Sequence, residues 1–129
     1  MKINLTGFIF ILIIVQLNFC CSRVNNNNNN TSRVIKYESS GNFPAGKIAS
    51  YTIATGSTFN EPLATLPWTK EITYAINVTA ANIAVSGNGG LPGQTVTTVV
   101  KRGGAVISNT IATTDTAGSF SKSAPVIVF

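Results

Sequence analysis

From Val34 onward, apolar and β-branched residues occur in short runs, and glycine, proline and asparagine separate one run from the next. Runs of this length and composition are typical of β-strands. The runs cover residues 34–38, 48–54, 70–78, 82–85, 95–101, 105–112 and 119–128. No helical spacing of apolar residues appears among them. The pattern therefore predicts an all-β fold, one small antiparallel β-sandwich of immunoglobulin-like size over residues 34–129, with about seven strands.

The clearest alternation lies in residues 71–78. Here Ile72, Tyr74, Ile76 and Val78 occupy every second position, and polar or small residues stand between them. Because successive side chains of a strand point to opposite faces, these four side chains are expected on one face. We predict a strand that covers the core with that face, and therefore a buried Tyr74.

A tight hairpin is predicted at Gly103-Gly104. The two glycines stand between the runs 95–101 and 105–112. Glycine adopts positive φ angles without steric cost, and the primed two-residue turns of hairpins need such angles. The two runs should therefore be neighbouring antiparallel strands.

The first 21 residues have the pattern of an export signal. Lys2 supplies a positive charge, Phe8 to Val15 is an uninterrupted apolar run, and Cys20 and Cys21 close the segment. The run is short for a membrane-spanning helix, which needs about 20 apolar residues. The sequence therefore predicts a signal peptide over residues 1–21 and an exported protein.

The cysteine pair suggests a lipoprotein signal, because the first mature residue of a bacterial lipoprotein is a cysteine that carries diacylglycerol. Cys21 as the acceptor would follow the small residue Cys20, as cleavage normally requires. Cys20 as the acceptor would follow the bulky Phe19, although Leu17 would then stand three residues upstream, as is usual. Lipidation of Cys21 is favoured, with Cys20 as the alternative. An ordinary secretory signal, with cysteines that are removed or incidental, is the other interpretation.

Residues 22–33 contain six consecutive asparagines, Asn25 to Asn30, and have no apolar periodicity. Such a stretch cannot bury enough apolar surface to offset the entropy lost on ordering. We therefore predict a disordered tether between the membrane anchor and the folded domain. Since no cysteine follows Cys21, packing rather than a disulfide must stabilise that domain.

Charge and composition narrow the range of functions. Nine lysines and arginines against four acidic residues give a formal net charge of +5, but only Lys101 and Arg102 are adjacent. This scatter argues against a nucleic-acid interface. The chain has no histidine, which excludes a Ser-His-Asp triad and a histidine-rich metal site. We expect no enzymatic activity, no metal site and no cofactor. The four acidic residues, expected as solvated charges at strand ends, are Glu38, Glu61, Glu71 and Asp115.

The segment Leu66–Lys70 is the most distinctive part of the domain. It contains the chain's one tryptophan, Trp68, directly after Pro67 and before the best predicted strand. An indole in this position either caps the core or stays partly exposed at a sheet edge, where it would mark a partner surface. Pro67, Trp68 and Lys70 are therefore the candidate partner surface.

The order of several motifs resembles the MmpS family, the small accessory proteins of mycobacterial RND-type lipid and siderophore exporters. The resemblance rests on Tyr37–Gly41, Ala49–Gly56, Leu66–Ile72, Gly89-Gly90, Val96–Val100 and Gly103-Gly104. It implies a β-sandwich behind an N-terminal membrane anchor and an accessory role in membrane transport. Family members often carry a cysteine pair in the last strands; the corresponding residues here are Thr98 and Ser121, which should then lie on facing strands.

Two functions follow as hypotheses. The first is a non-enzymatic cell-envelope lipoprotein, anchored to the membrane by its lipid, that binds or supports an envelope component such as a transporter. The alternative is a secreted carbohydrate- or surface-binding module that uses Trp68, Tyr51 and Tyr74 as stacking platforms. The alternative requires these aromatic rings to be exposed on one face.

Overall fold

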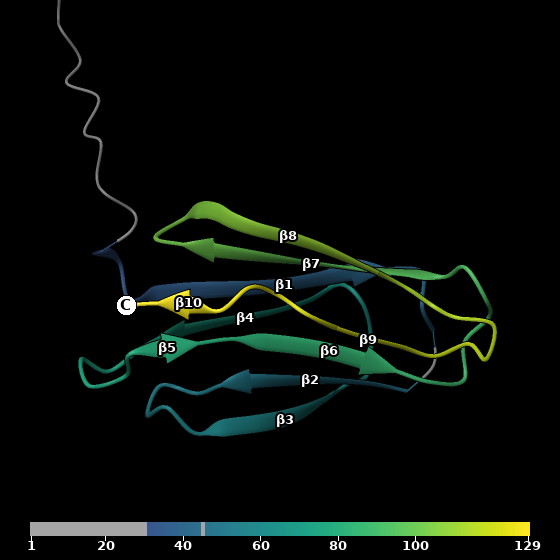
Figure 1. Ribbon diagram of the computed structural model, residues 1–129, viewed down its shortest axis with the longest axis horizontal. Helices are drawn as coiled ribbons and strands as arrows, with labels where there is room; N and C mark the ends of the chain where they lie inside the picture. Colours follow the sequence, from purple (N-terminus) through teal and green to yellow (C-terminus); the bar gives the residue numbers. More distant parts are fainter. Residues whose placement is uncertain (1–30, 45) are drawn as a thin grey trace, which may run out of the picture.

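The computed structural model describes residues 31–44 and 46–129. Within them the chain forms antiparallel β-sheets that pack against each other (Figure 1). The predicted signal peptide, Cys20, Cys21 and most of the predicted tether lie outside the described residues.

Two four-stranded sheets make up the sandwich, and every strand pair in them is antiparallel. The first sheet has the order β4 (Trp68–Thr73), β1 (Val34–Gly41), β7 (Thr95–Arg102) and β8 (Ala105–Thr113). The second has the order β3 (Thr58–Leu63), β2 (Lys47–Thr52), β6 (Ile83–Gly87) and β9 (Phe120–Ser123). A two-stranded pair, β5 (Ala80–Ala81) and β10 (Ile127–Val128), completes the fold.

The core lies between the two large sheets and is formed by alternate residues of each strand. In β7, for example, every second side chain is buried, from Val96 to Arg102. The first sheet contributes Ile35, Tyr37, Val96 and Val100, and the second contributes Ala49, Tyr51, Ile83 and Val85. This arrangement confirms the predicted small antiparallel β-sandwich.

The sheet orders place two pairs of edge strands beside each other. β4 and β3 are edges of the two sheets and are joined by the short connection of residues 64–67. β8 and β9 are the edges on the opposite side. Side chains of β3 and β4 contact each other between the two sheets at the β3/β4 edge. These contacts define the candidate site.

The predicted hairpin is confirmed. Gly103 and Gly104 have φ angles of 55° and 89°, and Arg102 pairs with Ala105 across the two-residue turn. These are the positive angles that only glycine adopts readily, so the turn joins β7 directly to β8.

The strand predicted over residues 70–78 is shorter than expected and begins earlier, at Trp68. Ile72, Tyr74 and Val78 are buried as predicted, but the prediction for Ile76 is wrong, because its side chain is 87% exposed. The backbone turns after Tyr74, and the Val78 N–H donates to the Ala75 carbonyl over 3.0 Å. Ile76 therefore lies in a turn, where the two-residue period of a strand no longer holds.

Other boundaries differ for reasons of backbone chemistry. β3 was not predicted, because Asn60, Glu61 and Pro62 all have low β propensity. Proline is tolerated there because β3 is an edge strand. The run predicted over residues 119–128 is interrupted around Pro125, which lacks an N–H, and forms β9 and β10 instead.

Contacts of the folded domain begin two residues before β1, within the predicted tether. Arg33 donates hydrogen bonds to the carbonyl oxygens of Tyr74, Ala75 and Val78. Arg102 donates to the Ser32 carbonyl over 2.7 Å. The start of β1 and the C-terminus lie at the same end of the sandwich (Figure 1).

Candidate binding cleft at the β3/β4 edge

Three side chains from two strands surround the carboxylate of Glu61 at the β3/β4 edge. Trp68 Nε1 donates to Glu61 Oε1 over 3.0 Å. The Tyr51 hydroxyl donates to Glu61 Oε2 over 2.5 Å, and Lys70 Nζ lies 3.2 Å from the same oxygen. We call these residues, Tyr51, Glu61, Trp68 and Lys70, the Glu61 cluster. It joins β3 and β2 of one sheet to β4 of the other.

The aromatic rings of the cluster pack against one another. The ring centres of Tyr51 and Trp68 are 6.0 Å apart, and those of Tyr51 and Phe59 are 5.9 Å apart with an interplanar angle of 62°. Lys70 Nζ lies 5.6 Å from the centre of the Tyr51 ring, close enough for a cation–π contact. The rings thus form one aromatic layer with a cation on its rim.

The hydrogen bonds of the cluster fix its charge states. Hydrogen bonds from Tyr51, Trp68 and Lys70 lower the pKa of the Glu61 carboxyl. The Tyr51 hydroxyl and the Glu61 carboxylate raise the pKa of the Lys70 ammonium. Burial, together with the bond to Glu61, raises the pKa of the Tyr51 hydroxyl. At neutral pH the cluster therefore holds an ionised carboxylate, an ammonium and a neutral phenol.

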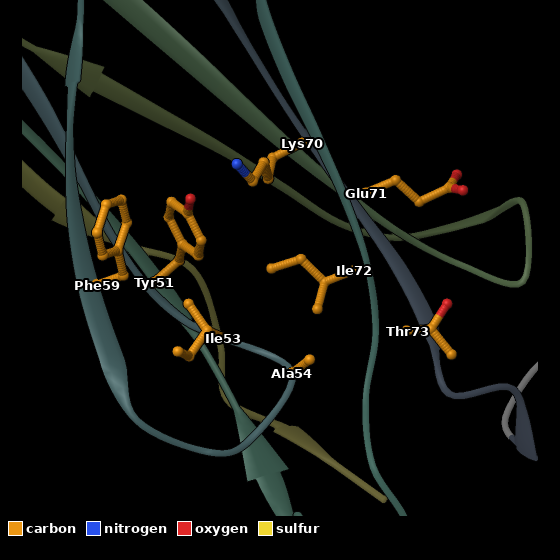
Figure 2. Close-up of a pocket in the computed structure, with 8 residues that line it drawn as sticks. All are labelled: Tyr51, Ile53, Ala54, Phe59, Lys70, Glu71, Ile72 and Thr73. Carbon is orange, nitrogen blue, oxygen red and sulfur yellow. The ribbon is translucent and has the colours of Figure 1, made fainter.

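An open cleft of about 430 Å³ lies beside the cluster, between the strand ends of the two sheets (Figure 2). Tyr51, Phe59 and Lys70 line it together with Ile53 and Ile72. In Figure 2, Lys70 points toward the Tyr51 ring, whereas Glu71 extends away on the other side of β4. The floor is apolar, and two charged residues, Lys70 and Glu71, line the cleft; the Lys70 ammonium is paired with Glu61.

This chemistry suits binding better than proton transfer. Glu61 already accepts three hydrogen bonds in its ionised form, so it has no proton to donate, and its lowered pKa makes it a weak base. Lys70 is held as an ammonium and cannot act as a nucleophile in that state. What the arrangement offers is a preformed apolar surface: Phe59, at its rim, is 49% exposed.

The structure brings two of the three predicted partner-surface residues into this site. Trp68 and Lys70 belong to the Glu61 cluster, and Trp68 is half-buried and packs against the core. Pro67 is exposed in the connection before β4 but does not line the cleft. The sequence interpretation missed Glu61 and Phe59, which lie on the unpredicted β3. The Gly56 turn after β2 and the pair Thr58-Phe59 were the available signals.

The aromatic platform required by the carbohydrate-binding hypothesis is not formed. Tyr51 is 1% exposed and Tyr74 is 3% exposed. The Tyr74 hydroxyl is used inside the domain, because it lies 2.8 Å from the Tyr37 hydroxyl and donates to the Thr52 carbonyl over 2.6 Å. Tyr51 and Tyr74 are therefore core residues, as predicted for Tyr74, and they cannot serve as the stacking platforms of the alternative hypothesis.

Thr98 and Ser121 lie in different sheets, but their side chains do not face each other. Thr98 is buried in β7, where its hydroxyl lies 3.2 Å from that of Ser39. Ser121 pairs with Ser86 in the second sheet and is exposed. The two residues thus lie on strands of opposite sheets, β7 and β9, with one side chain buried and the other exposed.

Two further features can be stated for the described part of the chain. Residues 31–44 and 46–129 contain no group of three or more acidic, cysteine or histidine side chains placed to hold a metal ion. Nor does this part contain a helix that is long and apolar enough to cross a membrane.

Comparison of the sequence with known families and with curated proteins finds no family model and no protein that matches it. The resemblance to the MmpS family therefore rests on the short motifs alone.

Proposed function

We propose that the chain is a non-enzymatic lipoprotein of the cell envelope whose β-sandwich binds another envelope component. The support for attachment comes from the sequence. The apolar run Phe8 to Val15 is followed, after residues 16–19, by Cys20 and Cys21, and no other cysteine occurs in the chain. Cys21 is the proposed lipid acceptor, with Cys20 as the alternative.

The asparagine-rich stretch fits this proposal, because it separates the proposed lipid from the domain. A flexible chain of this composition lets a tethered domain reach a partner at some distance from the membrane. The contacts of Ser32 and Arg33 then mark the point where the tether joins the domain.

The cleft beside the Glu61 cluster carries the binding part of the proposal. Its apolar floor, the half-exposed Phe59 ring and the rim ammonium of Lys70 would suit a partner that presents an apolar side chain next to an anionic group. The family resemblance favours a membrane transport assembly as that partner, and we include it in the proposal on that basis alone.

Site-specific photocrosslinking tests this proposal. A photoreactive phenylalanine analogue replaces Phe59 in the full-length chain. The chain is produced in the cells in which the protein naturally occurs. The matched control places the analogue at Val126, which is 61% exposed but does not line the cleft. We expect a defined adduct with an envelope protein from position 59 and none from position 126. Equal adducts from both positions, or none from position 59, would refute binding at the cleft.

A further inference from the structure

The strand β8 ends its sheet on the side of the sandwich opposite the cleft, where it also contacts β9 of the second sheet. Among the described residues its hydrogen-bonded strand partner is β7 alone, and β8 ends the order β4-β1-β7-β8. Figure 1 shows it as the outermost strand of its layer, at the top of the view. An edge of this kind presents a row of N–H and C=O groups that can pair with a further strand.

β8 lacks two of the features by which proteins usually protect such an edge, charged residues and proline; its one bulge, at the register shift, lies before the regular stretch that begins at Ser108. It is nine residues long and contains no charged residue and no proline. The other edges of the two large sheets are interrupted: β4 contains Lys70 and Glu71, β3 contains Glu61 and Pro62, and the four-residue β9 contains Lys122. Among these four edge strands, β8 is thus the longest and the one without charge or proline, and it is open to pairing.

The face beside this edge exposes apolar side chains. Ile111 is 59% exposed and lies opposite Thr97, and Val106 is 60% exposed and lies opposite Lys101. The register shifts between Val100 and Lys101, so β8 is regular from Ser108 to Thr113. This regular stretch, with Ile111 on its outer face, is the part that can accept another strand.

A second copy of the same chain is the partner that fits this edge. Each chain carries a formal net charge of +5, so two copies repel wherever their basic residues meet. Pairing through β8 brings no like charges together across the strands, because β8 has none. It also brings the exposed Ile111 side chains of the two copies onto one face of the joined sheet.

We propose that β8 of one copy pairs antiparallel with β8 of a second copy around a two-fold axis, so that the two first sheets become one continuous sheet. Such an interface uses the same surface on both copies, as symmetric dimers do. Because β4 and β8 are opposite edges of the first sheet, both clefts stay open at the two ends of the dimer. The dimer would then present two copies of the proposed binding site, which raises avidity for a repeated partner.

Sedimentation velocity of the purified full-length chain in non-denaturing detergent tests this proposal. The wild type is compared with Ile111→Lys, which places a charge on the proposed seam. The matched control is Ile76→Lys, the same substitution at an 87% exposed isoleucine in a turn. Asn109→Lys is a second seam variant that removes no apolar side chain. Thermal melting of each variant checks that the domain is folded.

We expect a concentration-dependent dimer in the wild type and in Ile76→Lys. Ile111→Lys and Asn109→Lys should raise the dimer dissociation constant at least about tenfold while melting like the control. A wild type that stays monomeric between about 1 μM and about 1 mM overturns the proposal. The proposal is also overturned if the wild type dimerises but both seam variants have the same dissociation constant as Ile76→Lys. That result would place the dimer contact elsewhere in the chain. If the interface exists but the cleft binds nothing, only the crosslinking at Phe59 fails.

Discussion

Trp68 Nε1 donates a 3.0 Å hydrogen bond to Glu61 Oε1 and thereby connects β4 of one sheet to β3 of the other. The two strands are edges of different sheets, so no backbone ladder joins them. The bond therefore links the two sheets beside the cleft, together with the packing of Trp68 against the core. The stability of the domain and the shape of the proposed site both depend on this pair.

Trp68→Ala should lower the free energy of unfolding by about 2 to 3 kcal/mol, because the half-buried indole packs against the core. Trp68→Phe retains most of the packing but removes the donor to Glu61, and should cost about 1.5 kcal/mol. Urea denaturation measures both losses. Midpoints equal to that of the wild type would show that the indole contributes nothing to the fold.

The Glu61 cluster should make the stability of the folded domain depend on pH. Because the pKa of the Glu61 carboxyl is lowered in the folded state, its contribution is present above the unfolded value of about 4.3 and is lost as pH falls through the folded value. Glu61→Gln should therefore lower the melting temperature at pH 6 to 7, and the gap to the wild type should close below about pH 4.

Glu71→Gln is the matched control for that experiment. It removes the same formal charge from a side chain that points away from the cleft (Figure 2). Its effect at pH 7 should stay within about 0.5 kcal/mol, as is usual for surface changes. A gap between Glu61→Gln and the wild type that is constant from pH 3 to 7 would contradict the assigned bonds.

The two buried tyrosine hydroxyls should differ in importance. Tyr74 donates to the Thr52 carbonyl, so the bond between the hydroxyls must be donated by Tyr37. Tyr37→Phe removes one bond and should cost about 1 kcal/mol, whereas Tyr74→Phe leaves two buried partners unsatisfied and should cost about 2 kcal/mol or more. Denaturation of both variants by urea provides the comparison. The reverse order would show that the donor assignment is wrong.

Phe129 should stabilise the domain through cation–π contacts of its ring with two arginine side chains. The Arg33 guanidinium lies 4.4 Å from the centre of the Phe129 ring, that of Arg102 lies 5.1 Å from it, and the Tyr74 ring is 5.0 Å away. Phe129→Leu keeps an apolar side chain but loses the ring, and should cost about 1 kcal/mol. In a domain of this size that is a fall of about 4 to 8 °C in melting temperature. No fall would exclude a contribution from these contacts.

Much of the fold could be predicted because local chemistry determines it. Gly103-Gly104 marks its hairpin by backbone freedom alone, and the alternation at Ile72 and Tyr74 marks a buried face. β3 could not be predicted in the same way. Its Pro62 and Glu61 are poor strand residues, and the pairing with β2 that makes it a strand is a tertiary contact.

The site was predictable only in part, for the same reason. Trp68 and Lys70 stand close together in the sequence, and Trp68 is the chain's one tryptophan. The carboxylate that organises them, Glu61, lies on the other sheet, and Tyr51 comes from a third strand. Nothing in the local pattern around Glu61 distinguishes it from a solvated surface charge.

Metabolic labelling with a fatty-acid analogue tests the central claim of envelope attachment most directly. The full-length chain is expressed in a bacterial host beside a known lipoprotein, and is compared with Cys20→Ser, Cys21→Ser and the double variant. We expect a labelled wild type and loss of the label in Cys21→Ser, or in Cys20→Ser if that residue is the acceptor. An unlabelled wild type beside a labelled control lipoprotein, or a label that persists in the double variant, would contradict that claim and favour a freely secreted domain.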